Sequence, residues 1–202
     1  MALFHNLYFW ITLLVLAYVA MRLYTSRHRW QAAGQPVASA PPASRPNLAA
    51  GAPPRPAGVA LARQPIRGLG TMELPTGPGW EHEYDANKDD HLFFNEELAM
   101  VVNVRNQPDG MRGYEQEYLD SYHQVNVRDA PNWQRGPEEL GQLAGVSAAR
   151  THGQFNNGQA WVTRDYLLFG AANTVILQTR VPAPLAERLA LTDYLAASFQ
   201  PA

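Results

Sequence analysis

The sequence predicts an α+β domain over residues 71–202, with one antiparallel β-sheet and two helices packed on it. Short apolar runs separated by Gly, Pro, Asn and Asp predict strands joined by hairpin turns. Two longer stretches repeat apolar residues at the three- and four-residue spacing of amphipathic helices. Since the order along the chain is strands, helix, strands, helix, we expect both helices to cover a shared sheet.

The first half of this region predicts three strands, at residues 80–85, 92–94 and 98–105. The first strand alternates, so that Trp80, His82 and Tyr84 share one face and three acids share the other. Turn residues from Asn106 to Gly110 end the third strand.

An amphipathic helix is predicted over residues 111–125, and an irregular segment broken by Pro131 follows at 129–136. One face of the helix is apolar or aromatic and is expected to be buried. This face holds Met111, Tyr114, Tyr118, Leu119, Tyr122 and Val125.

The second half predicts three more strands, at residues 146–155, 160–169 and 174–181. The sequence Asn156-Asn157-Gly158 favours a tight hairpin between the first two, because Asn-Gly tolerates positive φ. A closing helix is predicted to begin at Pro182 and Pro184. Its buried face would hold Leu185, Leu189, Leu195 and Phe199.

Five of these segments together resemble a known superfamily. They are the opening at 75–80, LFFNEELAMVVNV at 92–104, GQAWVTRDYLLF at 158–169, TVILQTRV at 174–181 and the helix end at 197–199. They resemble the PsbP/DcrB-like superfamily, which joins photosystem extrinsic subunits, DcrB-type envelope proteins, type VI secretion effector chaperones and a nuclear-transport factor. The resemblance implies a compact module that binds partner proteins and usually performs no chemistry. Many members carry a lipoprotein signal, which this chain lacks because it has no Cys.

Residues 1–30 predict a transmembrane anchor with a basic flank. Leu7 to Met21 contains 15 residues without a charge, and the apolar stretch extends over 21 residues from Leu3 to Leu23. At about 1.5 Å per residue this length crosses a hydrocarbon core of about 30 Å. Tyr8 and Trp10 lie where interfacial aromatic residues are favoured.

The basic flank predicts that this span is retained in an inner (cytoplasmic) membrane. No Lys or Arg precedes the apolar run, whereas Arg22, Arg27, Arg29 and Trp30 follow it, the reverse of a cleaved signal peptide. Because basic residues prefer the cytoplasmic side, the C-terminal domain is expected in the cytoplasm, with a periplasmic placement as the alternative.

Residues 31–70 predict a Pro/Ala-rich linker. Its eight prolines between Gln31 and Pro65, with few large apolar residues, bury too little surface to offset the entropy of ordering. The tract is expected to be a semi-extended tether, or alternatively a strap that becomes ordered along a partner.

Charge is unevenly distributed along the chain. Residues 1–72 contain seven Arg and no acid, and residues 73–202 carry a net charge of −9. A basic segment beside a bilayer is attracted to anionic lipid headgroups, so these lipids are predicted partners. Nucleic acid is not predicted, because the arginines are spaced among Pro and Ala with no aromatic residue between Trp30 and residue 72.

One acidic segment has the spacing of a calcium loop. Asp85, Asn87, Asp89, His91 and Glu96 occupy positions 1, 3, 5, 7 and 12 of that pattern. Position 6, which needs Gly for a sharp turn, is Asp90, and the flanks are predicted strands rather than helices. We therefore favour a solvated hairpin turn and keep a divalent-cation site as the alternative.

No motif of catalysis or cofactor binding is present. The absence of Cys excludes thiol chemistry, and the histidines lack the paired spacing of a zinc site. Ser147 lacks the nucleophile-elbow glycine, and Arg164 and Asp165 are expected to form cross-strand pairs. The sequence predicts no cofactor and no enzyme.

The predicted function is that of a single-pass, non-catalytic accessory subunit of a larger membrane protein complex, photosynthetic or respiratory. The domain would pack on partner subunits through the surface around Trp133 and the acidic hairpin. Two alternatives are a secretion chaperone or immunity-type module that grips a client segment beside the sheet, and a module that responds to a divalent cation.

Overall fold

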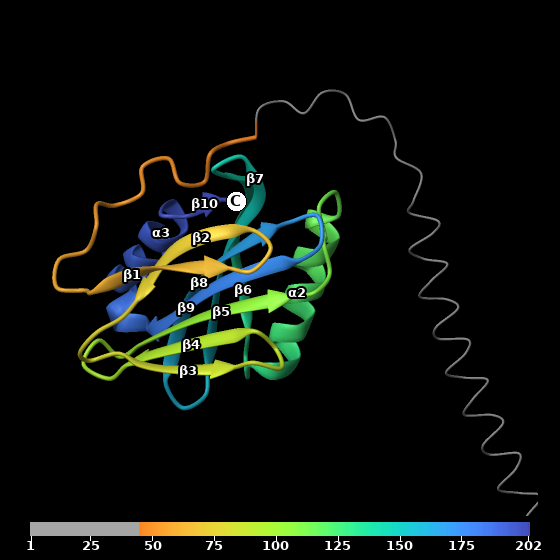
Figure 1. Cartoon of the computed structure of the whole chain (residues 1–202). Coiled ribbons are helices and arrows are strands. Elements are labelled where there is room, and N and C mark those ends of the chain that lie inside the picture. The colour runs from red at the N-terminus through yellow and green to blue at the C-terminus, as the bar shows by residue number, and fades with distance from the viewer. Residues whose placement is uncertain (1–44) are drawn as a thin grey trace, which may run out of the picture. The chain divides into compact units, whose positions relative to one another are not determined.

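The computed structural model describes residues 45–202 and confirms the predicted α+β class (Figure 1). A seven-stranded antiparallel sheet has the order β3-β4-β5-β9-β8-β7-β6. Its strands are β3 (Glu81–Asp85), β4 (Asp90–Asn95), β5 (Met100–Gln107), β6 (Gln134–Leu143), β7 (Val146–Asn156), β8 (Ala160–Phe169) and β9 (Thr174–Pro182). A small second sheet contains β1 (Leu61–Ile66), β2 (Gly70–Pro75) and β10 (Gln200–Pro201) in the order β1-β2-β10. The helices are α2 (Glu115–Asp129), the 3-10 helix η1 (Ala183–Leu189) and α3 (Ala190–Ala197).

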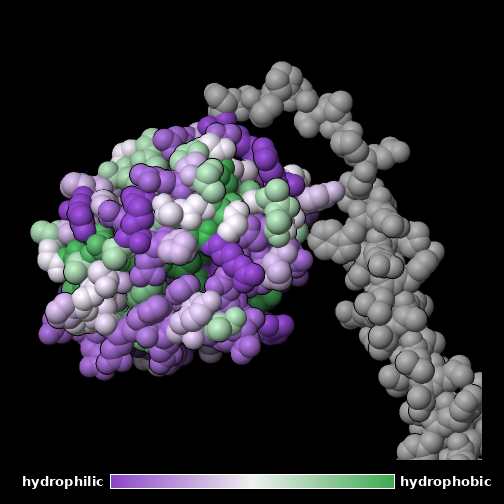
Figure 2. All heavy atoms as spheres, in the orientation of Figure 1, coloured by the Kyte–Doolittle hydropathy of each residue, from purple (hydrophilic) through white to green (hydrophobic). Residues whose placement is uncertain are grey.

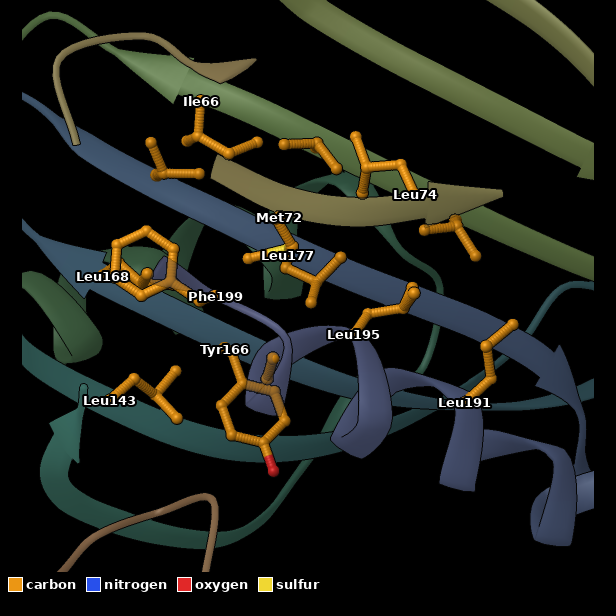
Figure 3. Close-up of a cluster of buried hydrophobic side chains, with 14 of the residues drawn as sticks. Ile66, Met72, Leu74, Leu143, Tyr166, Leu168, Leu177, Leu191, Leu195 and Phe199 are labelled. Carbon is orange, nitrogen blue, oxygen red and sulfur yellow. The ribbon is translucent and has the colours of Figure 1, made fainter. Parts of the chain in front are cut away.

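The two faces of the large sheet carry separate cores because side chains alternate along each strand. On β8, Tyr166 and Leu168 belong to the main core, whereas Leu167 and Phe169 belong to the second core with α2. The main core is completed by β2 and α3, which lie together on that face (Figure 3).

The closing helical segment is confirmed as a buried element. Leu189, Leu195 and Phe199 are all buried in the main core, as predicted, and Leu185 is partly buried against it. The segment starts as the 3-10 helix η1 after Pro182 and becomes regular only from Ala190. Burial of each large aliphatic side chain contributes about 1.5–3 kcal/mol to the free energy of folding.

The folded region starts earlier than the predicted boundary at residue 71. Leu48 is 4% exposed, and its N–H donates to the carbonyl of Gln142 on β6. β1 then occupies residues that were predicted as linker and pairs with β2 over its full length. The prediction failed here because Pro65 and a weak apolar alternation hide β1, which forms a hairpin with the adjacent strand β2. The predicted anchor at 1–30 and linker residues 31–44 lie outside the described residues.

Two further predictions are corrected by the structure. Residues predicted as irregular begin β6 at Gln134, and the strand accommodates Pro137 through a register shift between Arg135 and Glu138. Helix α2 begins and ends four residues later than predicted, and Val125 is 41% exposed instead of buried. In residues 45–202, no helix combines the length and the apolar composition that crossing a bilayer requires.

Candidate functional site

A groove lies on the α2 side of the large sheet, beyond the strands β6 and β7 over which α2 packs. It has a volume of about 350 Å³ and draws its walls from β4, β5, β9, the β7–β8 turn and the ends of β7 and β8. The lining residues are Leu92, Phe94, Val101, Asn103, Phe155, Asn157, Trp161, Gln178 and Arg180.

Strand register brings these side chains to one face. Phe94 on β4 pairs with Val101 on β5, and Val101 pairs with Arg180 on β9. Two residues away on each strand, Leu92 pairs with Asn103, which pairs with Gln178. The groove floor is therefore made of two cross-strand rows, one mostly apolar and one mostly polar.

Aromatic rings form the wall of the groove. The ring of Phe155 stacks on Trp161 with centroids 6.3 Å apart, and on Trp133 at the same separation. The Arg180 guanidinium carbon lies 6.0 Å from the centre of the Phe155 ring, which is within the range of a cation–π contact. This end of the groove is suited to a large apolar or aromatic group with a polar rim.

Trp133, predicted as a partner-binding residue, lies at the end of this aromatic row. Its indole rests directly on Gly153, where a Cβ atom would come within 2.0 Å of the ring. The Trp133 Nε1 atom is buried and has no hydrogen-bond partner in the described chain. The structure therefore places Trp133 half-buried beside the groove.

The polar groups of the groove are only partly satisfied. The Gln178 side-chain oxygen accepts hydrogen bonds from Nε and Nη2 of Arg180, at 2.9 and 2.5 Å. Burial lowers the pKa of Arg180, an effect that the nearby Asp165 carboxylate opposes. The Oδ1 atom of Asn103 is buried without a partner in the described chain, which carries a desolvation cost.

Sequence analysis did not identify these residues as a site, although β4 carried a signal. Phe93 is buried in the main core, but Leu92 and Phe94 point to the other face and remain half-exposed. A strand near a sheet edge that is apolar on both faces needs cover on both faces. Within residues 45–202, the face that carries Phe93 is fully buried, whereas the face that carries Leu92 and Phe94 is not.

The structure separates the candidate calcium ligands. Asp85 and Asp90 face each other beside the β3–β4 turn, whereas Glu96 follows the other end of β4, about 20 Å away at the usual rise per strand residue. The Asp85 Oδ1 atom accepts the N–H of Asn87, and the Asp89 carboxylate accepts from Tyr84 and Asn106. This segment is a hydrogen-bonded hairpin turn, at the hydrophilic lower edge of the surface in Figure 2.

The other candidates from the sequence have structural roles or lie elsewhere. Tyr122 is buried, and Tyr114 and Tyr118 pack against the second core, which confirms that this stripe is core. Arg164 and Asp165 do form cross-strand contacts, with His152 and Gln178. The predicted membrane and partner residues of the anchor lie outside the described residues: Tyr8, Trp10, Arg22, Arg27, Arg29 and Trp30.

Comparison with solved structures identifies proteins with a similar fold. The solution structure of cyanobacterial PsbP (CyanoP) from Synechocystis sp. PCC 6803 matches with a TM-score of 0.51 and 11% identity, over 75% of this chain and 98% of that chain. The Saccharomyces cerevisiae Ran-binding protein Mog1p matches with a TM-score of 0.48 and 13% identity, over 71% and 96%. A structure from Bacteroides thetaiotaomicron VPI-5482 has a TM-score of 0.44 and 12% identity; the match covers 65% of this chain but only 44% of that one.

The match to CyanoP shows a PsbP-like fold, in agreement with the resemblance seen in the sequence. At this identity the likeness concerns the fold alone. The sequence matches no protein-family model and no curated protein.

Proposed function

We propose that this chain is a non-catalytic accessory subunit of a membrane protein complex, and that the groove beside α2 binds a partner subunit. The observation that carries this proposal is the open groove itself. Its half-exposed apolar floor and aromatic wall have the composition of an interface centre, in which aromatic residues and Arg are enriched.

The groove is matched to a protein segment in size and chemistry. A volume of about 350 Å³ accommodates one or two large side chains. Phe94 and Trp161 line the groove and would pack against the side chains of the partner. The partner segment therefore brings a large apolar residue as its anchor.

The apolar stretch at 3–23 and the arginines that follow it support a membrane location for this binding module. A membrane anchor confines the domain to a thin layer and raises its effective concentration toward other membrane proteins. A groove of modest area then suffices for stable assembly.

Photo-crosslinking in the native membrane tests this proposal. A photoreactive phenylalanine analogue at Asn157, which is exposed at the groove rim, should crosslink to a membrane protein. The same analogue at Glu187, exposed on η1, is the matched control and should not.

Truncation of the aromatic wall should then weaken the same complex. Trp161→Ala is expected to lower recovery of the crosslinked partner in mild detergent by roughly 30-fold, because loss of an interface Trp costs about 2 kcal/mol. Val127→Ala, on the exposed face of α2, should leave recovery unchanged. Equal recovery with Trp161→Ala and wild type would contradict the proposed role of the groove.

A secretion chaperone is the second candidate, since the same groove suits a client segment. The two functions differ in the partner: a chaperone binds an isolated client peptide in solution, whereas an accessory subunit co-purifies with its complex at fixed stoichiometry. Crosslinking at Asn157 to a soluble or secreted protein would favour the chaperone.

A further inference from the structure

The two edges of the large sheet differ in how they are protected. At the β6 edge, the Gln142 N–H donates to the carbonyl of Pro46, and the carbonyl of Gln142 accepts the N–H of Leu48. Pro137 and the register shift beside it interrupt the same strand. Proteins protect sheet edges by devices of this kind, because an uncovered edge can pair with another chain.

β3 forms the opposite edge, and no strand within residues 45–202 pairs with its outer side (Figure 1). Its register with β4 is continuous from Glu81 to Asp85, without Pro or a bulge. The residues from Glu81 to Tyr84 are all exposed. Because only alternate residues of β3 hydrogen-bond to β4, the others direct their N–H and C=O groups away from the sheet.

The side of β3 that faces the groove is acidic. Glu83 is the cross-strand partner of the groove residue Leu92, and Glu81 lies two residues away on the same face. Asp85 is paired with Lys88 at 3.4 Å. The carboxylates of Glu81 and Glu83, in contrast, have no hydrogen bond or ion pair with any of residues 45–202. They are therefore available to a cation from outside.

A hollow of about 240 Å³ adjoins Glu83. Leu92 lines it, as does Asp90, whose cross-strand neighbour Arg105 opposes its charge. The apolar stem of a Lys or Arg side chain would pack on Leu92 while its charged head lies beside Glu83. The hollow thus has the room and the chemistry for one basic side chain.

The other side of β3 is aromatic. His82 stacks on Phe93 with ring centroids 4.4 Å apart, and Tyr84 lies against His91 with centroids 4.5 Å apart. The Nε2 atom of His82 lies 3.1 Å from the Nδ1 atom of His91, in one hydrogen bond that links the two imidazoles. Tyr84 is nevertheless 51% exposed. An apolar side chain on a neighbouring strand would pack beside these rings as a cross-strand neighbour.

We propose that β3 pairs with an extended segment of a partner protein in which basic residues alternate with apolar or aromatic ones. The added strand places its Arg or Lys side chains beside Glu81 and Glu83, and its apolar side chains beside His82 and Tyr84. In strand addition, main-chain hydrogen bonds provide affinity and alternate side chains provide specificity. This contact goes beyond the groove interaction proposed above and does not depend on it.

Charge argues against a second copy of this chain as the occupant. Two β3 strands paired antiparallel about their central residue, Glu83, would bring the carboxylates of both copies side by side. Like charges directly opposite each other destabilise a strand pair. The acids therefore oppose self-pairing and favour a basic strand, so repulsion and attraction both contribute to specificity.

Binding of synthetic peptides to the full chain in a mild non-ionic detergent tests the proposal. Fluorescence anisotropy should detect binding of a labelled peptide in which Arg and Val alternate, with both ends capped. A peptide with the same residues grouped into an Arg block and a Val block should bind roughly tenfold more weakly, because its basic side chains cannot share one face. Equal affinity for the two peptides would overturn the proposal, since net charge alone would then explain binding.

Main-chain pairing has its own test. N-methylation of every residue of the alternating peptide removes its backbone donors but keeps its charge and its side chains. We expect this peptide not to bind. Retention of the original affinity would overturn pairing with the edge of β3.

Charge reversal locates the contact on the chain. Glu83→Lys should weaken binding of the Arg–Val peptide by roughly threefold or more and should favour a peptide in which Glu alternates with Val. Glu117→Lys makes the same charge change at an exposed position on α2 and is the matched control, with the affinity of the wild type. Equal losses in the two variants would overturn the proposal. A wild-type dimer in sedimentation that dissociates on Glu83→Pro would also overturn it, because a second copy would then occupy the edge.

Discussion

Burial on β8 strongly changes the acid–base chemistry of Asp165. It is fully buried on β8, where its Oδ2 atom accepts hydrogen bonds from the Tyr122 hydroxyl at 2.8 Å and from the Gln178 amide at 3.3 Å. Its Oδ1 atom has no partner within the described chain. Burial raises the pKa of Asp165 to about 6, although these hydrogen bonds and nearby Arg180 act to lower it.

This raised pKa predicts a pH dependence of stability. The folded state binds the Asp165 proton more tightly than the unfolded chain, whose pKa is about 3.9. The stabilising contribution is therefore complete below pH 4 and is lost as the pH rises through about 6. Asp165→Asn should gain up to about 3 kcal/mol relative to the wild type between pH 4 and pH 7.

Urea unfolding of both proteins at several pH values measures this difference. The histidines whose pKa values are lowered by burial, such as His123 and His152, contribute equally to both and cancel. A difference in the free energy of unfolding that stays constant from pH 4 to pH 7 would contradict the raised pKa of Asp165.

Among the structural elements, the segment before β1 changes the organisation of the fold most. The Gln142 N–H donates to the carbonyl of Pro46, and Leu48 returns a hydrogen bond to Gln142, so residues 46–48 cover the free edge of β6. Arg45 donates to Ser147 at 2.8 Å and lies 3.3 Å from the Glu115 carboxylate. A stretch with the composition of a linker thus protects a sheet edge and connects it to the start of α2.

Leu48 should therefore behave as a core residue in spite of its proline-rich surroundings. Because its side chain is buried against the main core, Leu48→Ala is expected to lower the free energy of unfolding by about 2–4 kcal/mol. Val127→Ala, at an exposed position, should change it by less than about 0.5 kcal/mol. Thermal unfolding followed by circular dichroism makes the comparison, and similar melting temperatures for the two variants would show that the segment does not pack as described.

At the scale of the whole molecule, the large sheet depends on contacts between distant parts of the chain. β5 pairs with β9, although α2 and three strands lie between them in sequence. The small sheet joins β2 to β10 at the C-terminus, where the Ala202 N–H donates to the carbonyl of Leu69. The first and the last segments of the described region therefore pack into the same main core.

This arrangement predicts where the chain can be shortened. A protein of residues 45–202 retains β1, β2 and Leu48 and should unfold cooperatively. A protein of residues 71–202 lacks β1 together with buried Leu48, Ile66 and Leu69, and it exposes Met72 and Leu74 of β2. We expect the shorter protein to aggregate or to melt without a cooperative transition; equal melting temperatures would refute the boundary.

The sequence by itself determined the fold class, the strands from β3 to β5 and from β7 to β9, the buried face of the closing helix and most of the buried face of α2, with Val125 as the exception. Those features depend on local periodicity, on turn residues such as Gly158, and on the prolines that begin the closing helical segment. It also showed that Leu92, Phe93 and Phe94 form an apolar strand. It did not show that one face of this strand is buried in the main core while the other face remains half-exposed.

Only the tertiary structure decided the small sheet, the groove beside α2 and the pairing of His82 with His91. Each of these depends on which strands become neighbours and in which register. Register places Asn103 between Leu92 and Gln178, and it brings two unremarkable histidines within 3.1 Å of each other. Pairing between distant segments, such as β5 with β9 and β2 with β10, is selected by burial of the whole core, and this selection leaves no periodic pattern in any single stretch of the sequence.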